Sequence, residues 1–218
     1  MRLRRSATAA VALGATALLL TGCGAQAAPG VDWKTTVPQE YAHNRYVAAL
    51  IEGLSQAAHA TNVGDFTFAA LNASITPEYR WGIYLDYIRD RSDEAWAFPG
   101  PRPFALISVN ERADGRGATI LSCMALGDRV ITAKNPDPMT VWEGAQISPF
   151  GEEPNSVVYT QDLAEDDAGH LLLSEPEQLL GESNRKCDLT DAAVGFFDPL
   201  PTPRLPGDVP PNEQPVHP

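Results

Sequence analysis

The sequence predicts an α+β domain in which helices come first and an antiparallel sheet follows. Apolar residues recur at helical spacing from Val47 to Ile88, behind three separate helix-start signals. From Phe104 onward the apolar segments become short and rich in β-branched residues, and compact turn clusters separate them. Adjacent strands joined by short turns run antiparallel, so this second half is expected to form an antiparallel sheet.

The N-terminus has the three parts of a bacterial secretory signal over residues 1–22. Three arginines within the first five residues precede an apolar run from Ala7 to Leu20, and small residues follow. The alternatives are a cytoplasmic helix, a membrane span and an ordinary cleaved signal, and the run is shorter than the roughly 20 apolar residues that a span needs.

Leu20-Thr21-Gly22-Cys23 resembles a lipobox. This resemblance to bacterial lipoproteins implies cleavage before Cys23 and a diacylglycerol thioether on its sulfur, with further acylation of the new N-terminus, such as palmitate, in some lineages. Two or three acyl chains anchor a protein stably, whereas one chain holds it only marginally. The expected location is therefore the extracytoplasmic side of the cell membrane.

Charge and composition limit the partners. The chain has 218 residues and is 44% hydrophobic, which is enough for one globular core. Without the arginines of residues 1–22, 13 basic residues stand against 28 acidic ones, a formal net charge of −15. A body this acidic is repelled by nucleic-acid phosphates and by anionic lipid headgroups. We therefore expect no nucleic-acid partner, and we expect the lipid on Cys23 to provide the membrane attachment.

With Cys23 assigned to the lipid, the exported part of the chain contains two cysteines, Cys123 and Cys187. Two thiols outside the cytoplasm usually form a disulfide. Closing so long a loop removes unfolded-state entropy worth about 4 kcal/mol in the simple chain model. The alternatives are two buried free thiols or a catalytic Cys with a His, although nothing beside either Cys indicates an activated thiolate.

Two segments outside the domain are expected to lack a fold. Residues 23–36 begin with small residues in no periodic pattern and predict a flexible tether. Residues 198–218 contain eight prolines and predict a disordered tail with polyproline II character. This tail is interpreted as a wall-spanning spacer, a docking segment or a merely solvated end. The folded domain is therefore expected to span residues 37–197.

Three helices are predicted in the first half of the domain. Thr36-Val37-Pro38-Gln39 resembles a capping box and predicts a long amphipathic helix from Pro38 to His59, with Asn62 and Gly64 as its stop. Asp65 is expected to cap a short second helix. Thr76-Pro77-Glu78 is expected to begin the third.

The third helix carries an expected apolar stripe of Trp81, Tyr84, Leu85 and Ile88. The charged run 89–94 is interpreted as its solvated end, and the proline-rich segment 99–103 ends all helical character. The segments predicted as strands are 104–109, 118–126, 129–132, 157–160 and 170–173, with turns at 114–117 and 165–169.

This order of elements resembles the NTF2-like cone as found in actinobacterial lipoproteins. The resemblance covers most of residues 37–190 and rests on these features: the lipobox, the helix from Pro38 to His59, the hairpin around Asp114-Gly115, the segment Ala118–Cys123 and the hairpin leading towards Cys187. It implies a sheet curled around a pocket that the long first helix closes.

Members of the wider superfamily include isomerases and polyketide cyclases that use a carboxylate and a Tyr or His inside the cone, while many others have no chemistry. The candidate bases here are Asp65, Asp86, Asp90 and His59. Each has a plainer role: Asp65 as a helix cap, Asp86 and Asp90 beside arginines on a helix surface, and His59 near a helix end. The sequence therefore predicts no catalytic residue and no cofactor.

Metal binding is not predicted either, because His43, His59, His170 and His217 lack partners at ligand spacing. The acidic segment 162–169 lacks the alternating oxygen ligands of a calcium loop. Aromatic residues near the third helix, including Trp81, Tyr84 and Tyr87, are interpreted as core or as the wall of a pocket for an apolar ligand.

The sequence thus predicts a lipid-anchored, extracytoplasmic binding or interaction module of the bacterial cell envelope, whose partner is an envelope protein or an apolar small molecule. Two alternatives stay open: a small-molecule enzyme of the NTF2-like isomerase or cyclase type, and a purely structural surface spacer. The residues that line the pocket would distinguish these three functions.

Overall fold

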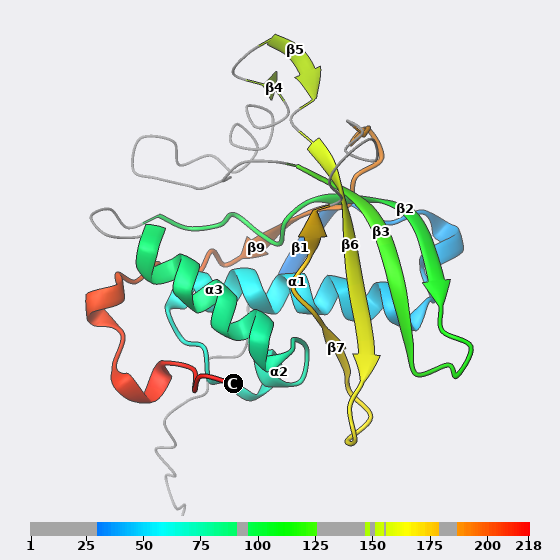
Figure 1. The fold of residues 1–218 in the computed structure, drawn as a ribbon. Helices are drawn as coiled ribbons and strands as arrows, with labels where there is room; N and C mark the ends of the chain where they lie inside the picture. Colours follow the sequence, from blue (N-terminus) through cyan, green and yellow to red (C-terminus); the bar gives the residue numbers. More distant parts are fainter. Residues whose placement is uncertain (1–29, 91–95, 126–146, 149–150, 155, 179–186) are drawn as a thin grey trace, which may run out of the picture.

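The chain forms an α+β structure with helices and antiparallel sheets, as the sequence predicts. The computed structural model describes residues 30–90, 96–125, 147–148, 151–154, 156–178 and 187–218. Helix α1 (Arg45–Val63) crosses one face of the main sheet, and helix α3 (Pro77–Asp90) packs against α1 (Figure 1). The predicted signal at 1–22, Cys23 and the predicted strand at 129–132 lie outside the described residues.

Helix α1 starts later than the capping-box pattern predicts. Its N-cap is Asn44, whose side-chain oxygen accepts the backbone N–H groups of Tyr46 and Val47 at 2.9 and 3.1 Å. Pro38 is extended and precedes only a short 3-10 turn, Gln39–Tyr41. The helix ends where predicted, because Gly64 takes a left-handed φ of 66° that a residue without Cβ adopts at no cost.

The second helix, α2 (Ala69–Asn72), is short, and Asp65 does not cap it as the sequence predicts. The Asp65 carboxylate instead accepts the Thr67 backbone N–H and hydroxyl at 2.9 and 2.8 Å, so it closes a local turn before the helix. Phe68 occupies the cap position without a side-chain bond.

Helix α3 begins at the predicted residue, with the Tyr79 N–H donating to the Thr76 hydroxyl at 3.2 Å. Its predicted apolar stripe is partly wrong, because Leu85 and Ile88 are 42% and 43% exposed. The fully buried side chains of α3 are Tyr79 and Tyr87 instead.

The main sheet has the strand order β2-β3-β6-β7, with β8 paired to the other end of β6. All of its pairs are antiparallel. Its strands are β2 (Phe104–Glu111), β3 (Gly117–Ala125), β6 (Ser156–Glu165), β7 (Leu171–Leu173) and β8 (Glu177–Gln178). The hairpin between β2 and β3 turns at Gly115, whose φ of 68° again requires a glycine-like backbone. A small separate pair consists of β4 (Ile147–Ser148) and β5 (Gly151–Pro154).

A second sheet corrects the prediction of a flexible tether at residues 23–36 for its second part, while residues 23–29 lie outside the described residues. Strand β1 (Gly30–Thr35) pairs antiparallel with β9 (Val194–Asp198), with Gly30 opposite Asp198 and Trp33 opposite Gly195. Gly195 leaves room for the Trp33 ring, because a Cβ there would meet it at 2.9 Å. Neither strand is predictable locally, since each becomes ordered only by pairing with a segment more than 150 residues away.

The C-terminal residues 198–218, predicted to be a disordered tail, pack against the helices (Figure 1). The Arg204 backbone N–H donates to the Asn62 carbonyl at 3.1 Å, and the Arg204 carbonyl accepts the Tyr87 hydroxyl at 3.0 Å. Further along, the Phe66 N–H donates to the Glu213 carbonyl at 2.9 Å.

This C-terminal segment also contributes to the core, since Val209 is 6% exposed and belongs to the main buried cluster. Two short 3-10 turns, Pro206–Asp208 and Pro211–Glu213, shape it, and the Arg204 guanidinium pairs with the Glu213 carboxylate at 2.7 Å. Prolines have little conformational entropy to lose, so a proline-rich composition does not prevent docking. The fold therefore also includes residues 30–35 and 198–218, which the predicted domain of 37–197 leaves out.

The main core lies between α1 and the sheet. Its fully buried members include Leu50, Phe66, Leu71, Ile75, Phe104, Ile120, Met124, Leu163 and Leu173. A smaller cluster surrounds Cys123 and Cys187, whose sulfur atoms lie 2.06 Å apart, as in a disulfide bond. This is the pairing that the cysteine count predicts. None of the described helices is long and apolar enough to span a bilayer.

Candidate functional site

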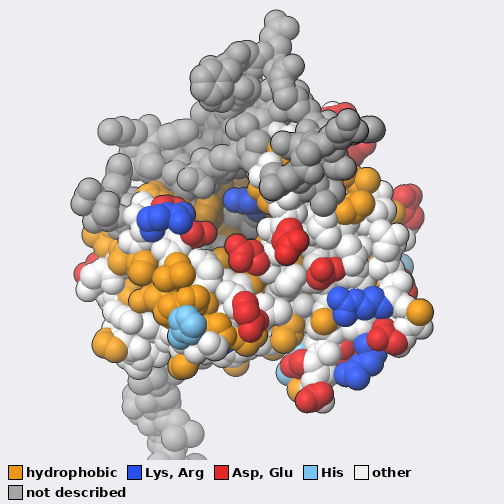
Figure 2. Space-filling view, viewed as in Figure 1, with side chains coloured by type: hydrophobic (Ala, Val, Ile, Leu, Met, Phe, Trp, Pro, Cys, Tyr) orange, Lys and Arg blue, Asp and Glu red, His pale blue; other side chains and the backbone are white. Residues whose placement is uncertain are grey.

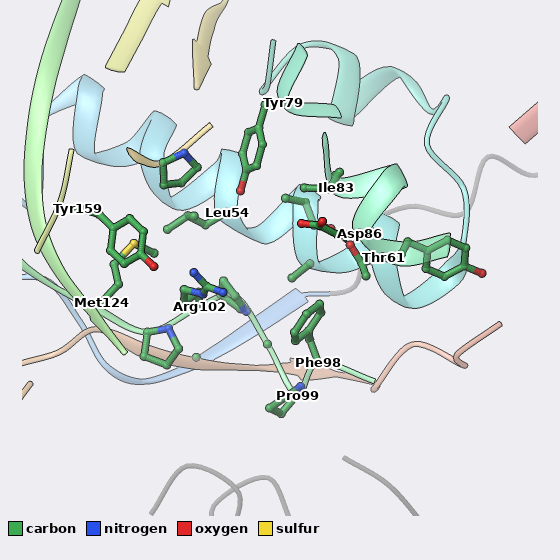
Figure 3. A pocket seen from close by; sticks show the side chains of 18 of the residues that line it. Leu54, Thr61, Tyr79, Ile83, Asp86, Phe98, Pro99, Arg102, Met124 and Tyr159 are labelled. Atoms are coloured by element: carbon green, nitrogen blue, oxygen red, sulfur yellow. Dashed lines mark hydrogen bonds between the residues drawn. The ribbon is translucent and has the colours of Figure 1, made fainter. Parts of the chain in front are cut away.

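A cavity of about 340 Å³ lies between α1, α3, the proline-rich segment 96–103 and β9 (Figure 3). Small-molecule sites in proteins occupy roughly 300–1,000 Å³, so this cavity suits a small ligand. Its apolar walls come from every side: Leu54 from α1, Ile83 from α3, Met124 from β3 and Phe98 from the proline-rich segment. Such walls favour an aromatic or aliphatic molecule.

The proline-rich segment forms one rigid wall of the cavity. Pro99, Pro101 and Pro103 are buried, and Gly100 lies so close to β9 that a Cβ would meet the Gly195 carbonyl oxygen at 2.0 Å. The Pro99 carbonyl accepts the Phe197 N–H at 2.7 Å. Phe104, at the other end, exchanges backbone bonds with Ala193. The backbone between them is therefore held at both ends.

Arg102 is the exposed residue within this buried segment. Its guanidinium reaches into the cavity, towards the space that the Tyr79 and Tyr159 hydroxyls also face (Figure 3). Among the described carboxylates, none lies within ion-pairing distance of Arg102. In a chain with so large an acidic excess, this guanidinium is left available to a ligand.

Tyr79 places a phenol on the opposite wall. It is 9% exposed, and its position is fixed because α3 starts against β7, where the Thr76 N–H donates to the Leu173 carbonyl at 3.0 Å. Burial raises the pKa of Tyr79 to about 12, with the nearby Arg102 charge acting in the opposite direction. The phenol therefore stays protonated at neutral pH and remains a hydrogen-bond donor.

Among the described residues, three carboxylates also line the cavity, and two of them are already engaged. Arg89 pairs with Asp86 at 2.9 Å and with Asp90 at 2.7 Å. The hydrogen bond from Arg89 lowers the pKa of Asp90. Glu175 lies over Gly82 of α3, where a Cβ would be 3.4 Å from its carboxylate oxygen. Glu175 is thus the lining carboxylate with no cation in ion-pairing distance among the described residues.

The candidate bases do not gather in one place. Asp86 and Asp90 line the cavity at its α3 side, whereas Asp65 closes its turn and His59 lies outside the lining. His59 is 1% exposed, between the rings of Phe68 and Phe197 at centroid distances of 5.5 and 6.2 Å. Burial lowers its pKa, against the raising effect of the Asp65 charge.

The other histidines are dispersed over the surface. His43 is exposed, His170 bonds the Asp166 carboxylate at 3.1 Å, and His217 lies edge-on to Trp81. Within the described ranges, no three His, Cys, Asp or Glu side chains are grouped so that they could hold a metal ion. Of the aromatic residues proposed as core or pocket wall, Tyr87 lines the cavity from a buried position, while Trp81 and Tyr84 do not line it.

The sequence analysis missed several site residues, among them Arg102, Tyr79 and Tyr159. Arg102 lies in a segment that is easily interpreted as a helix terminator alone. An arginine flanked by prolines on both sides is the one local signal, because the rings restrict the backbone and hold the side chain in place. Tyr79 precedes the predicted stripe by two residues and gives no separate signal.

Comparison with protein-family models, curated proteins and solved structures finds no match to this chain. The functional argument is therefore made from the geometry of the cavity and from the sequence signals.

Proposed function

We propose that this protein is a lipid-anchored, extracytoplasmic binding protein of the bacterial cell envelope, and that its cavity takes a small molecule with an apolar body. The lipobox at Leu20–Cys23 supports the anchoring. The cavity carries the binding proposal, because apolar walls from α1, α3 and β3 surround a small number of polar groups. This combination is typical of ligand sites.

We also propose the NTF2-like cone as the finer description of the fold. Its support is the arrangement of a long first helix laid across an antiparallel sheet (Figure 1). The cavity is lined by this helix and by Met124 and Tyr159 of the sheet. The β1–β9 pair and the packed C-terminal segment are additions to that plan in this chain.

Binding is better supported than catalysis. A general base is most effective with a pKa near neutrality, and it must face the substrate. The hydrogen bond from Arg89 lowers the pKa of Asp90, which makes it a weaker base, and the Asp86 carboxylate is engaged by the same Arg89 guanidinium. His59 is sealed between two aromatic rings outside the lining.

The pocket can be tested with 2-naphthamide, an uncharged aromatic probe, by following naphthalene fluorescence during titration into the purified full chain. We expect saturable binding at one site. Ile83→Trp should fill the cavity and weaken binding at least tenfold, whereas Leu85→Trp, on the exposed face of the same helix, should not change it. Equal binding by all three proteins would contradict the pocket.

The anchor can be tested by metabolic labelling with a fatty-acid analogue in a bacterial host. Cys23→Ala should lose both the label and membrane retention on fractionation. Undiminished labelling of the Ala variant would contradict the lipoprotein proposal.

The enzyme alternative has its own test. Turnover of an ester, sugar or ketosteroid-like substrate that disappears in Asp86→Asn would favour the enzyme alternative.

A further inference from the structure

We propose that the cavity selects a monocarboxylate, with the Arg102 guanidinium binding the carboxylate and the apolar walls holding the rest of the molecule. This inference rests on the proposed small-molecule binding and names the chemical class of its ligand. It is argued from the charges that line the cavity and from what each of them already contacts.

The first argument is that Arg102 is held in place and has no ion-pair partner among the residues that the structure describes. Its neighbours Pro101 and Pro103 are buried, and the backbone on either side is bonded to the β9 region through Pro99 and Phe104. An arginine kept on a fixed backbone loses less entropy on binding than one on a mobile loop. Its planar fork also matches the two oxygens of a carboxylate.

The second argument is that two phenols face the same space as Arg102. Tyr79 comes from α3 and Tyr159 from β6, where its backbone is fixed between β3 and β8. Neither hydroxyl has a hydrogen-bond partner among the described residues, and both are directed into the cavity (Figure 3). Donors from α3, β6 and segment 96–103 that face the same space can bind an acceptor group.

The third argument concerns the number of charges. The charged side chains among the described lining residues are one guanidinium, Arg102, and three carboxylates, of which Asp86 and Asp90 share Arg89 as their partner. A phosphate monoester would bring a charge of about −1.5 to −2 at neutral pH. A singly charged carboxylate therefore suits the Arg102 guanidinium better, because a second negative charge on the ligand would lie among the carboxylates of Asp86, Asp90 and Glu175.

The test compares 2-naphthoate with 2-naphthamide, which share a shape and differ in charge. For the full chain we expect naphthoate to bind about tenfold or more tightly, the effect of a charge-assisted hydrogen bond. Arg102→Gln should remove this preference while leaving naphthamide affinity within about twofold. Arg112→Gln removes the same charge from an exposed position outside the lining and should keep the preference.

Two further variants leave Arg102 in place, so they test the proposal even if Arg102→Gln fails to fold. Glu175→Gln removes a nearby negative charge and should strengthen naphthoate binding without changing naphthamide binding. Tyr79→Phe should weaken naphthoate selectively. Naphthamide binding without any naphthoate preference, or a preference that survives Arg102→Gln, would overturn the carboxylate proposal and leave the pocket standing. Failure of both probes to bind would overturn the pocket as well.

Discussion

Helices α1 and α3 depart from the amphipathic pattern in opposite directions. Every residue of α1 from Gly53 onward is buried, including polar ones such as Gln56, His59 and Asn62. In α3, by contrast, Leu85 and Ile88 are exposed, and an apolar surface covers this part of the molecule in Figure 2. Helix α1 is thus enclosed together with its polar side chains, whereas α3 leaves two large apolar side chains exposed.

The difference shows that a helix's burial depends on the segments that surround it as well as on its own stripe. The second half of α1 is covered by the sheet, by β9, by segment 96–103 and by the C-terminal segment. Its polar side chains serve as attachment points, as when Asn62 bonds the Phe98 carbonyl and N–H at 2.9 and 2.7 Å. Within the described structure, nothing comparable covers the outer face of α3.

Removing residues 199–218 should lower the free energy of unfolding more than the other changes below, because it exposes buried parts of α1. Loss of three backbone-linked hydrogen bonds at about 1 kcal/mol each and of buried Val209 should lower the free energy of unfolding by about 5 kcal/mol. Urea denaturation measures this. Removing only residues 216–218, where Val216 is 82% exposed, is the control, and an unchanged midpoint for the longer truncation would show that the segment is not part of the fold.

The disulfide has the next largest expected effect. Cys187 precedes the segment that leads into β9, and Cys123 lies in the middle of β3, so the bond ties the cover of α1 to the main sheet. The double variant Cys123→Ser/Cys187→Ser should be less stable by about 4 kcal/mol, given the 64-residue separation. Reduced wild-type protein should match it. Mass spectrometry of unreduced peptides that finds both thiols free would contradict the bond.

Because His59 in the enclosed helix α1 is buried, the free energy of unfolding should depend on pH. Burial lowers its folded pKa below the ordinary value of 6.5, so below that pH the unfolded chain binds a proton that the folded protein excludes. Stability should therefore fall as pH drops below about 6.5, by up to about 1.4 kcal/mol per pH unit from this group. His59→Leu should flatten that part of the unfolding free-energy profile, while His43→Gln, at an exposed position, should leave it in place. An unaltered slope in His59→Leu would contradict this assignment.

The smallest effect is expected on the exposed face of α3. Leu85→Ala and Ile88→Ala should each change the unfolding free energy by less than about 0.5 kcal/mol. Leu50→Ala, at a fully buried position of α1, should cost about 3 kcal/mol. Calorimetric melting of the three variants makes the comparison directly. A loss at Leu85 as large as at Leu50 would mean that this face is covered in solution.

The same contrast explains which parts of the fold follow from the sequence. The end of α1 at Gly64, the start of α3 at Thr76-Pro77 and the turn at Gly115 depend on backbone preferences of single residues, and they are predicted correctly. The start of α1 is not, because Asn44 and the Thr36 pattern are both acceptable caps and packing decides between them.

The missed elements depend on distant partners. Strand β1 forms because β9 lies beside it, and the C-terminal segment docks because α1 and α3 offer it Asn62 and Tyr87. The candidate site is missed for the same reason, since Arg102 and Tyr159 come from separate regions of the chain and meet only across the folded cavity. The lipobox and the cysteine count are local signals and need no such partner.

The position of β1 also sets how far the domain would stand from a bilayer. Its first residue, Gly30, follows Cys23 by seven positions, and a fully extended chain covers at most about 3.6 Å per residue. If Cys23 bears lipid, the linker from Cys23 to Gly30 is therefore no longer than about 25 Å, which is less than the thickness of the hydrocarbon core of a bilayer. A protein so tethered would sample only the water layer next to the headgroups, so its ligands would be those that leave, enter or accumulate at that surface.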